Sequence, residues 1–247
     1  MSGLLLVLFI WGHMFFESSI LISKDAMYRV TKFFEGRYFF GADYPILVTL
    51  AATVILAIFV LHAALAMRKF PASYREYQAI RGHIRAFDHG DTSLWWLQVW
   101  TGFALFFLGS VHLINMITQP GNIGPYASAD RIVSGWMWPV YAMLLVTVHL
   151  HAGIGVYRLA VKWDPFGGAN PEARLLFLRR ARWAIVGFFL LLGFASIGTY
   201  IRIGIEHREH KGERYVPGWE RDITNRSAAP ETGAVPYRMI GQPDSTQ

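Results

Sequence analysis

Residues 44–67 read YPILVTLAATVILAIFVLHAALAM, and this stretch decides the fold. It contains no Asp, Glu, Lys or Arg, and its only histidine is His62. A bilayer core about 30 Å thick requires roughly 20 apolar helical residues to cross it. The stretch therefore predicts a membrane-spanning helix that carries an imidazole inside the hydrocarbon.

The composition of the whole chain fits a membrane protein. Of its 247 residues 53% are hydrophobic, 15% aromatic and only 16% charged, whereas a soluble chain has about 25% charged residues. The sequence has no cysteine, which excludes disulfides, iron–sulfur clusters, zinc–thiolate sites and covalently attached haem within this chain. The net charge of +6 lies between apolar runs, a pattern typical of a membrane protein rather than of a nucleic-acid-binding one.

Four further apolar runs predict an all-α integral membrane protein with five transmembrane helices. The run at 92–129 is too long for one crossing, and it is interrupted by Pro120, Gly121, Gly124 and Pro125. We therefore expect a span at 94–118 followed by an irregular linker. The first run lacks a basic lead and a small-residue cleavage site, which indicates a retained span rather than a signal peptide. The remaining spans are expected at residues 3–16 with an extension to 23, at 132–157 and at 183–201.

The distribution of Lys and Arg predicts the orientation. The connections at 68–93 and 158–182 carry eleven of these residues, and those at 23–43 and 119–131 carry five. The positive-inside rule then gives a cytoplasmic N-terminus and a periplasmic C-terminus, although the basic tail favours the opposite. We expect a multi-pass protein of the bacterial cytoplasmic (inner) membrane, with a transmembrane domain at 1–206 and a polar tail at 207–247.

Histidines within the apolar runs need a physical reason, because ionisable groups in hydrocarbon are costly. A single imidazole there is expected to hydrogen-bond a neighbouring helix. Five such residues on four of the five predicted helices favour a shared function instead; they are His13, His62, His112, His149 and His151.

The depths of these histidines suggest two pairs. If the helices alternate in direction, His62 and His151 lie five and six residues before the inner ends of their spans, at one level. His13 and His112 lie nearer the opposite face. Two pairs at two heights are what two bis-His b-type haems need, whereas zinc lacks a third ligand at either level. Residues two apart on a helix face roughly opposite ways, so only one of His149 and His151 can serve such a site, and spacing does not decide which.

Several motifs occur in an order that closely resembles the dihaem cytochrome b membrane anchor of menaquinol:fumarate reductases, in the succinate dehydrogenase/fumarate reductase family. The resemblance runs from about residue 2 to 163, and more loosely through the last helix. It rests on Gly12-His13-Met14-Phe15-Phe16, Leu61-His62-Ala63, Ala66-Met67-Arg68-Lys69-Phe70-Pro71, His89-Gly90-Asp91-Thr92, Phe106-Phe107-Leu108-Gly109-Ser110-Val111-His112, Trp136-Met137-Trp138-Pro139, Leu150-His151 and Tyr157-Arg158-Leu159-Ala160-Val161-Lys162-Trp163.

The resemblance implies roles for individual residues. Four of the five helices form the dihaem-binding bundle, with His62 and His151 on the iron of the inner (proximal) haem and His13 and His112 on that of the outer (distal) haem. Glu35 matches the carboxylate that accepts protons from menaquinol beside the distal haem. Weaker matches to positions that contact haem propionates are Trp95, Arg131 and Lys162.

Two intramembrane residues depart from the family's pattern. His149 stands where a glutamate is proposed to carry protons through the membrane, and we hypothesise that its imidazole relays them instead. A polar group bonded to a neighbouring helix explains His149 equally well. Glu17, one turn beyond His13, has no counterpart in the pattern and no role assigned by it.

The resemblance also implies the function and the partners. The chain would anchor a quinol:fumarate oxidoreductase and oxidise menaquinol. It would then pass electrons through two haem b groups to an iron–sulfur subunit and an FAD-containing fumarate reductase flavoprotein, in a dimer of heterotrimers. Fumarate chemistry lies on a partner chain, and the direction, fumarate reduction or succinate oxidation, stays open. The alternatives are the haem b subunit of a hydrogenase or formate dehydrogenase, and a non-haem proton channel or transporter that uses the intramembrane histidines.

Overall fold

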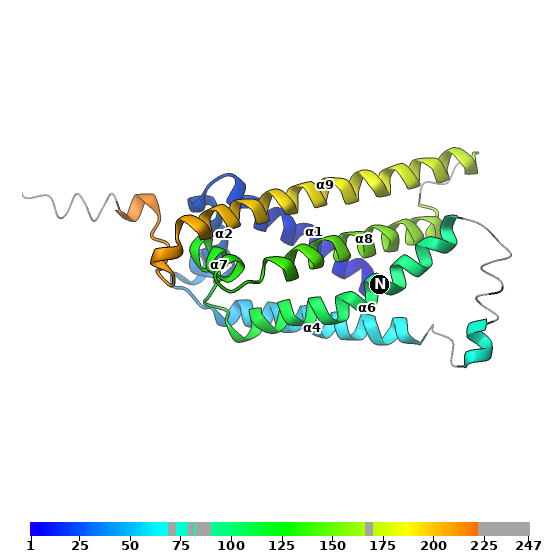
Figure 1. The fold of residues 1–247 in the computed structure, drawn as a ribbon, viewed down its shortest axis with the longest axis horizontal. Helices are drawn as coiled ribbons and strands as arrows, with labels where there is room; N and C mark the ends of the chain where they lie inside the picture. The colour runs from blue at the N-terminus through cyan, green and yellow to red at the C-terminus, as the bar shows by residue number, and fades with distance from the viewer. Residues whose placement is uncertain (69–72, 79–81, 83–89, 166–169, 222–247) are drawn as a thin grey trace, which may run out of the picture. The chain divides into compact units, whose positions relative to one another are not determined.

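A computed structural model of the chain describes residues 1–68, 73–78, 82, 90–165 and 170–221, with the side chains of 90–93 left aside. The described residues are predominantly helical and contain no strand (Figure 1). The chain divides into two compact units, Met1–Tyr215 and Val216–Gln247. The second unit is described only at 216–221, where 218–221 form a helical turn. His89 of the motifs and most of the tail lie outside the described residues.

Five helices of the first unit are long and apolar enough to cross a membrane, as predicted. The first span joins α1 to a 3-10 helix, η1, and the third span lies within α6 at Leu94–Thr118. These spanning elements are α1 (Ser2–Glu17) with η1 (Ser18–Leu21), α4 (Ile46–Met67), α6 (Gly90–Thr118), α8 (Trp138–Trp163) and α9 (Pro171–Glu206).

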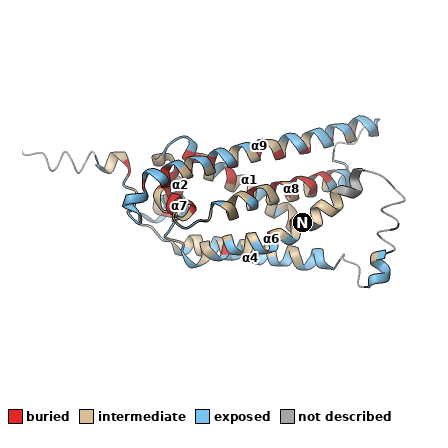
Figure 2. Cartoon of the chain, viewed as in Figure 1, coloured by how far each residue is buried: buried red, intermediate tan, exposed pale blue. Residues whose placement is uncertain are grey.

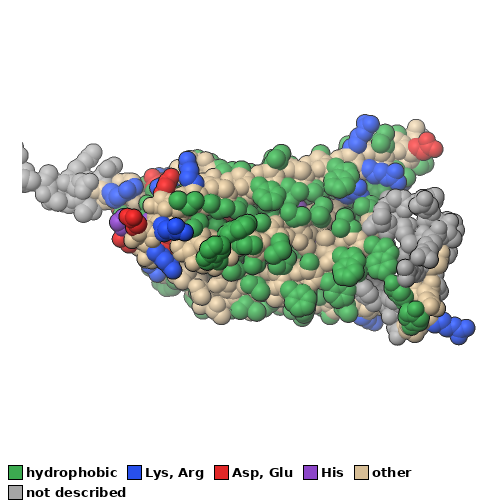
Figure 3. Space-filling view, in the orientation of Figure 1, with side chains coloured by type: hydrophobic (Ala, Val, Ile, Leu, Met, Phe, Trp, Pro, Cys, Tyr) green, Lys and Arg blue, Asp and Glu red, His purple; other side chains and the backbone are tan. Residues whose placement is uncertain are grey.

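The outer surface of these helices is apolar. Large side chains are widely exposed along them, such as Leu191 at 76% and Phe107 at 68%, and Figure 3 shows hydrophobic side chains covering the helices while Lys, Arg, Asp and Glu gather near their ends. An isolated exposed apolar residue is ordinary in a soluble protein, but a continuous apolar surface marks contact with membrane or protein. Lipid is the solvent in which this surface is stable, and helices satisfy their backbone hydrogen bonds there internally.

The last two spans begin at residues other than predicted. α8 starts at Trp138 rather than at 132, because the chain turns at Trp136, whose φ is +54°. α9 starts at Pro171 rather than at 183, so the segment 174–182, which was assigned to a connection, is helical. The Asn170 side chain accepts a hydrogen bond from Ala173 N at 3.1 Å, and proline at the first helical position needs no hydrogen-bond acceptor for its nitrogen.

The linker after α6 is not irregular throughout, which corrects that prediction. It contains α7 (Pro125–Val133), with Pro125 in its first turn, a position that suits proline because φ is already helical there. The connection between α1 and α4 is also helical, with α2 (Lys24–Phe34) and α3 (Arg37–Phe40). Ser23 caps α2 by accepting a hydrogen bond from Ala26 N at 2.9 Å.

Buried residues gather where α2 and α7 cover one end of the bundle (Figure 2). A core cluster there joins η1, α2, α7 and α9 and consists of Ile20, Met27, Ala129, Ile132, Tyr200 and Ile203. α8 packs on α9 and α6, and α6 packs on α4. By contrast, α4 has no buried residue in the described structure, because one side faces outward and the other lines an internal cavity.

The segment after α9 is tied back to this capped end within the first unit. His207 Nδ1 lies 3.1 Å from Asp130 Oδ1, and the His207 ring stacks on Tyr126 with centroids 4.0 Å apart. Asp130 Oδ2 accepts a hydrogen bond from Gly212 N at 2.9 Å, and Tyr215 donates one to Asp25 at 2.6 Å. These contacts hold the end of α9 and residues 207–215 on α7 and α2.

Replacing Gly204 on α9 by alanine is expected to destabilise the protein. The new Cβ would lie 2.7 Å from the backbone oxygen of Ala129 and 2.6 Å from Val133 Cγ2. Such overpacking lowers the free energy of unfolding by about 1–3 kcal/mol, which a lower thermal unfolding midpoint in detergent would report. Gly198→Ala on the same helix is the control, because no described atom lies within 4 Å of its added Cβ. Equal midpoints for the two variants would contradict close packing of α7 on α9.

Candidate functional site

The first unit contains a cavity of about 1860 Å³ between its helices, which is partly open to the outside. Most of the lining is apolar and comes from α1, α4, α6 and α8, with α2, α7 and α9 closing one end. Pockets for a single small ligand are usually about 300–1,000 Å³, so this cavity has room for more than one such group. Four of the five intramembrane histidines line it: His13, His62, His112 and His151.

His62 on α4 and His151 on α8 face each other across the cavity. Their ring centroids are 6.3 Å apart and the ring planes are nearly perpendicular, at 89°. His151 Nδ1 lies 3.1 Å from the backbone oxygen of Gln98 and 3.2 Å from Thr101 Oγ1, and His62 Nδ1 lies 3.3 Å from Ser2 Oγ. A hydrogen bond at Nδ1 fixes the ring and leaves Nε2 as the nitrogen that can ligate a metal.

His13 on α1 and His112 on α6 form the second pair. Their ring centroids are 6.2 Å apart and the planes are tilted by 53°. The His13 ring stacks on Phe9 at 5.7 Å, and the edge of the His112 ring meets Tyr141 on α8 at 5.5 Å. His112 Nδ1 is buried without a hydrogen-bond partner within the described part of the chain.

The separation within each pair fits two imidazoles that grip one iron from opposite sides. A metal–imidazole bond is about 2.0 Å long and the ring centre lies about 1.2 Å behind the nitrogen, so centroids across an iron are about 6.4 Å apart. The observed values are 6.2 and 6.3 Å. Glycines leave room for two of the rings. A Cβ at Gly3 would lie 3.0 Å from His62 Cε1, and a Cβ at Gly102 would lie 3.2 Å from His151 Cε1.

His149 lies on the other side of α8, away from this cavity. Its side chain is 2% exposed and its ring stacks on Phe189 of α9 with centroids 5.3 Å apart. Its Nδ1 is 2.8 Å from the backbone oxygen of Leu145, and its Nε2 is buried without a partner in the described structure. His149 and His151 therefore point in opposite directions from α8. The sequence spacing indicated this, but it did not decide which of the two faces His62.

The three residues with weaker family matches all line the cavity. Trp95 on α6 and Lys162 on α8 lie on the two helices that carry Gln98 and His151. Arg131 on α7 lies near His112 and donates hydrogen bonds to the Asn122 backbone oxygen at 2.8 Å and to Ser128 Oγ at 3.2 Å. Its Nε is buried and without a partner among the described residues.

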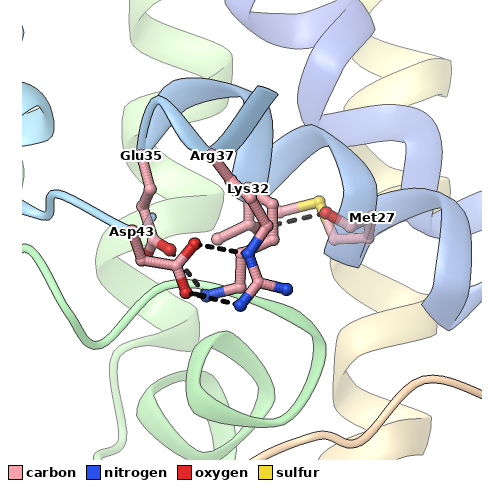
Figure 4. Close-up of polar contacts among 6 residues, drawn as sticks. Met27, Lys32, Glu35, Arg37 and Asp43 are labelled. Atoms are coloured by element: carbon pink, nitrogen blue, oxygen red, sulfur yellow. Dashed lines mark hydrogen bonds and ion pairs between the residues drawn. The ribbon is translucent and has the colours of Figure 1, made fainter. Parts of the chain in front are cut away.

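Glu35 lies in a charged network beside the capped end of the bundle (Figure 4). Lys32 Nζ donates hydrogen bonds to Glu35 Oε2 at 2.6 Å and to Asp43 Oδ2 at 2.9 Å, and Arg37 Nε lies 2.8 Å from Asp43 Oδ1. Glu35 is only 3% exposed and is not among the described residues that line the cavity, although Thr31 and Phe34 of the same helix are. Helical spacing predicts the Lys32–Glu35 pair. The sequence does not predict that Asp43 also accepts a hydrogen bond from Lys32.

The network shifts the pKa values of two of its members. Burial disfavours the charged amine of Lys32, but its hydrogen bonds to Glu35 and Asp43 and the charges of both carboxylates outweigh this and raise its pKa. Burial likewise disfavours the carboxylate of Asp43, yet Lys32 and Arg37 together lower its pKa. Both shifts keep the pair charged across the neutral range, where it stabilises the fold.

Two further residues face the cavity near the His13–His112 pair. Glu17 lies one turn beyond His13 and lines the cavity, as does Tyr200 on α9, whose hydroxyl group is buried without a hydrogen-bond partner among the described residues. Tyr200 is 1% exposed. Sequence reasoning noted Glu17 without a role and missed Tyr200, because a tyrosine in an apolar run gives no signal of its own.

The spanning helices and the paired histidines define an integral membrane protein of the kind that anchors respiratory complexes. The chain belongs to the family described as the succinate dehydrogenase/fumarate reductase transmembrane subunit, whose model matches residues 73–196. This confirms the resemblance found in the sequence.

Two relatives illustrate how far the similarity extends. The fumarate reductase cytochrome b subunit of Wolinella succinogenes is 48% identical over 208 residues, which cover 84% of this chain and 81% of that protein. The subunit of the same name from Helicobacter pylori strain 26695 is 48% identical over 209 residues, or 85% and 80% of the two chains.

Asp43→Asn is expected to destabilise the charged network at neutral pH. Hydrogen bonds to charged groups contribute about 1.5–3 kcal/mol, so the free energy of unfolding should fall by a similar amount. Because the folded-state pKa of Asp43 is lowered, its contribution is lost as the pH falls through that pKa, and the difference from the wild type should then vanish. Unfolding in detergent across a pH series measures this, with the exposed Glu209→Gln as control. A difference independent of pH would contradict it.

Proposed function

We propose that this chain is the dihaem cytochrome b subunit of a menaquinol:fumarate reductase. In this function it oxidises menaquinol and delivers electrons to an iron–sulfur subunit and an FAD-containing flavoprotein that reduces fumarate. The observation that carries the proposal is the presence of two pairs of facing imidazoles on four spanning helices. The ring centroids are 6.2 Å apart in one pair and 6.3 Å apart in the other. The name of the Wolinella and Helicobacter relatives, fumarate reductase cytochrome b subunit, supports it.

The four cavity histidines are the proposed axial ligands. His62 and His151 hold the proximal haem iron, and His13 and His112 hold the distal one. Haem b supplies a one-electron carrier inside the hydrocarbon when it is bound. The hydrogen bond from Nδ1 of His151 to the Gln98 backbone oxygen orients the ring and increases its basicity as a ligand.

Cationic and aromatic side chains of the lining are proposed to receive the haem propionates. Arg131 serves the distal group, in keeping with its place near His112. Lys162 and Trp95 serve the proximal group, because Lys162 lies on α8 with His151 and Trp95 lies on the neighbouring α6. A guanidinium or ammonium group pairs with a carboxylate strongly where water is scarce.

Glu35 is the proposed proton acceptor for quinol oxidation. A positioned carboxylate takes a proton in such a step when it is within reach of the substrate directly or through one water. Glu35 lies one turn beyond Thr31, which lines the cavity, and Lys32 holds its carboxylate at 2.6 Å. Lys32 also contacts Asp43, so its charge stays paired when Glu35 is protonated.

The remaining features of this function follow from the chain's charge pattern and its family. We propose residence in the bacterial cytoplasmic membrane with the N-terminus inside, assembly into a dimer of heterotrimers, and a division between a transmembrane domain at 1–206 and a polar tail at 207–247. Family membership favours this function over a hydrogenase or formate dehydrogenase subunit. The cytochrome b name of the relatives favours it over a non-haem channel.

His149 is the proposed proton relay that accompanies inward electron transfer. Moving each electron inward against the membrane potential costs about 2.3 kcal/mol per 100 mV, and a parallel proton path would cancel that cost. The Nδ1 hydrogen bond to Leu145 and the buried, unpartnered Nε2 leave one nitrogen able to accept a proton.

Haem content tests the ligand assignment. His112→Ala is expected to lose one of two b haems while the protein remains inserted in the membrane, because the distal pair has lost one of its imidazoles. His149→Ala, the matched control on α8, is expected to retain both. Haem per polypeptide is measured from the absorption spectrum of the purified protein. Two haems retained in His112→Ala would overturn the pairing.

Reconstitution in liposomes tests the relay. His149→Phe keeps a ring to stack on Phe189 but removes the nitrogens, so quinol oxidation coupled to fumarate reduction should generate a membrane potential and slow down. A voltage-sensitive dye and the turnover rate report these effects. Unchanged turnover without a membrane potential would remove His149 from the mechanism.

A further inference from the structure

Glu17 is an intramembrane carboxylate to which the proposed function gives no task. It ends α1 and is four residues beyond His13, so both side chains lie on the same face of the helix. Both line the cavity. A carboxylate inside a membrane span is costly and rarely kept without a function.

The surroundings of Glu17 form a polar end to an otherwise apolar cavity. Tyr200 lines the same cavity from α9 and is 1% exposed, and its hydroxyl group has no hydrogen-bond partner among the described residues. The polar side chains that line this end come from α1, α7, α8 and α9 and are Glu17, Ser128, Arg131, Tyr141, Ser196 and Tyr200.

Apolar side chains complete the same end of the cavity. α2 lines it with Met27, Val30 and Phe34, and with Thr31, whose hydroxyl group donates a hydrogen bond to the Met27 backbone oxygen. None of these four residues titrates. Met14 and Phe16 of α1 and Leu113 of α6 add to this apolar wall. A flat, two-ring quinol presents the complementary surface, because its faces are apolar and only its two hydroxyl groups are polar.

We propose that Glu17 binds a hydroxyl group of the quinol and takes its proton. This inference rests on the proposed function and deepens it. The quinol releases two protons and two electrons. One O–H bond breaks as its proton moves to a Glu17 carboxylate oxygen, the second proton moves to Glu35, and the electrons go to the carriers of the proposed function. Tyr200, which lines the same cavity and whose buried hydroxyl group has no partner among the described residues, supplies a second polar group for the same quinol oxygen.

The two carboxylates differ in a way that an experiment can separate. Glu17 lines the cavity, whereas Glu35 is held by Lys32 at 2.6 Å behind the lining residues. Removing Glu17 should therefore weaken quinol binding as well as proton transfer. Removing Glu35 should affect proton transfer alone. The other charged or titratable groups that line this end of the cavity are His13, His112, Arg131, Tyr141 and Tyr200, and all of them stay unchanged in both variants.

The test uses the purified complex with Glu17→Gln, Glu35→Gln and the exposed control Glu206→Gln at the end of α9. Glu17→Gln is expected to keep its haem, to retain less extractable quinone, and to show a raised KM for quinol with kcat lowered about 100-fold. The carboxylic acid band in the infrared spectrum, reduced minus oxidised, should disappear in this variant. Glu35→Gln should lower kcat with KM and bound quinone unchanged, and Glu206→Gln should match the wild type.

Each other outcome is decisive. Glu17→Gln with wild-type KM, quinone content and infrared band overturns the proposal, and so does loss of haem, which would mark Glu17 as structural. Tyr200→Phe is the second variant: it removes a buried hydroxyl group from the cavity lining, so KM should rise while the infrared band remains. A wild-type complex that carries haem but does not oxidise quinol would overturn the proposed function itself.

Discussion

The structure depends on how polar groups are satisfied where there is no water. In the hydrocarbon core every imidazole needs a hydrogen bond, a ring contact or a metal. The chain meets this need by facing the histidines in pairs, so that α1 stands opposite α6 and α4 opposite α8 with ring centroids about 6 Å apart. The cavity lies between these helices, and α4 lines it without a buried residue of its own in the described structure.

The same solvent explains why so much of the fold can be predicted from sequence. Only helices satisfy their own backbone in lipid, so length and hydropathy alone predicted five spans, and helix rise predicted that the histidines meet at two levels. The polar ends follow local rules that hydropathy does not detect. Asn170 and Pro171 start α9 well before its apolar part, and Pro125 starts a helix in a segment where proline and glycine predicted an irregular linker.

The contacts of the site are likewise of two kinds. Local contacts can be predicted from helical spacing, whereas contacts between distant segments cannot. Lys32 and Glu35 are three apart on a helix, so their pairing could be predicted, and the opposite directions of His149 and His151 could be predicted equally well. Asp43 reaches Lys32 only because the chain turns around α3 at Gly36, which has a φ of +81°. Tyr200 and Glu17 line the same cavity although they lie far apart in the sequence. Nothing in either segment predicts this, because it follows only once α9 has packed against α1.

In the proposed quinol oxidation, charge balance explains why two carboxylates serve better than one. Glu35 belongs to a network whose cations are also held by Asp43, so it can gain or lose a proton without leaving Lys32 unpaired. Glu17 lines the cavity together with Arg131 and Tyr200, so a cation and a hydroxyl group belong to the same lining as its carboxylate. A quinol gives up two protons, and a single buried carboxylate could hold only one of them. Two carboxylates on opposite sides of the cavity wall allow the protons to leave separately, without two like charges having to share one site.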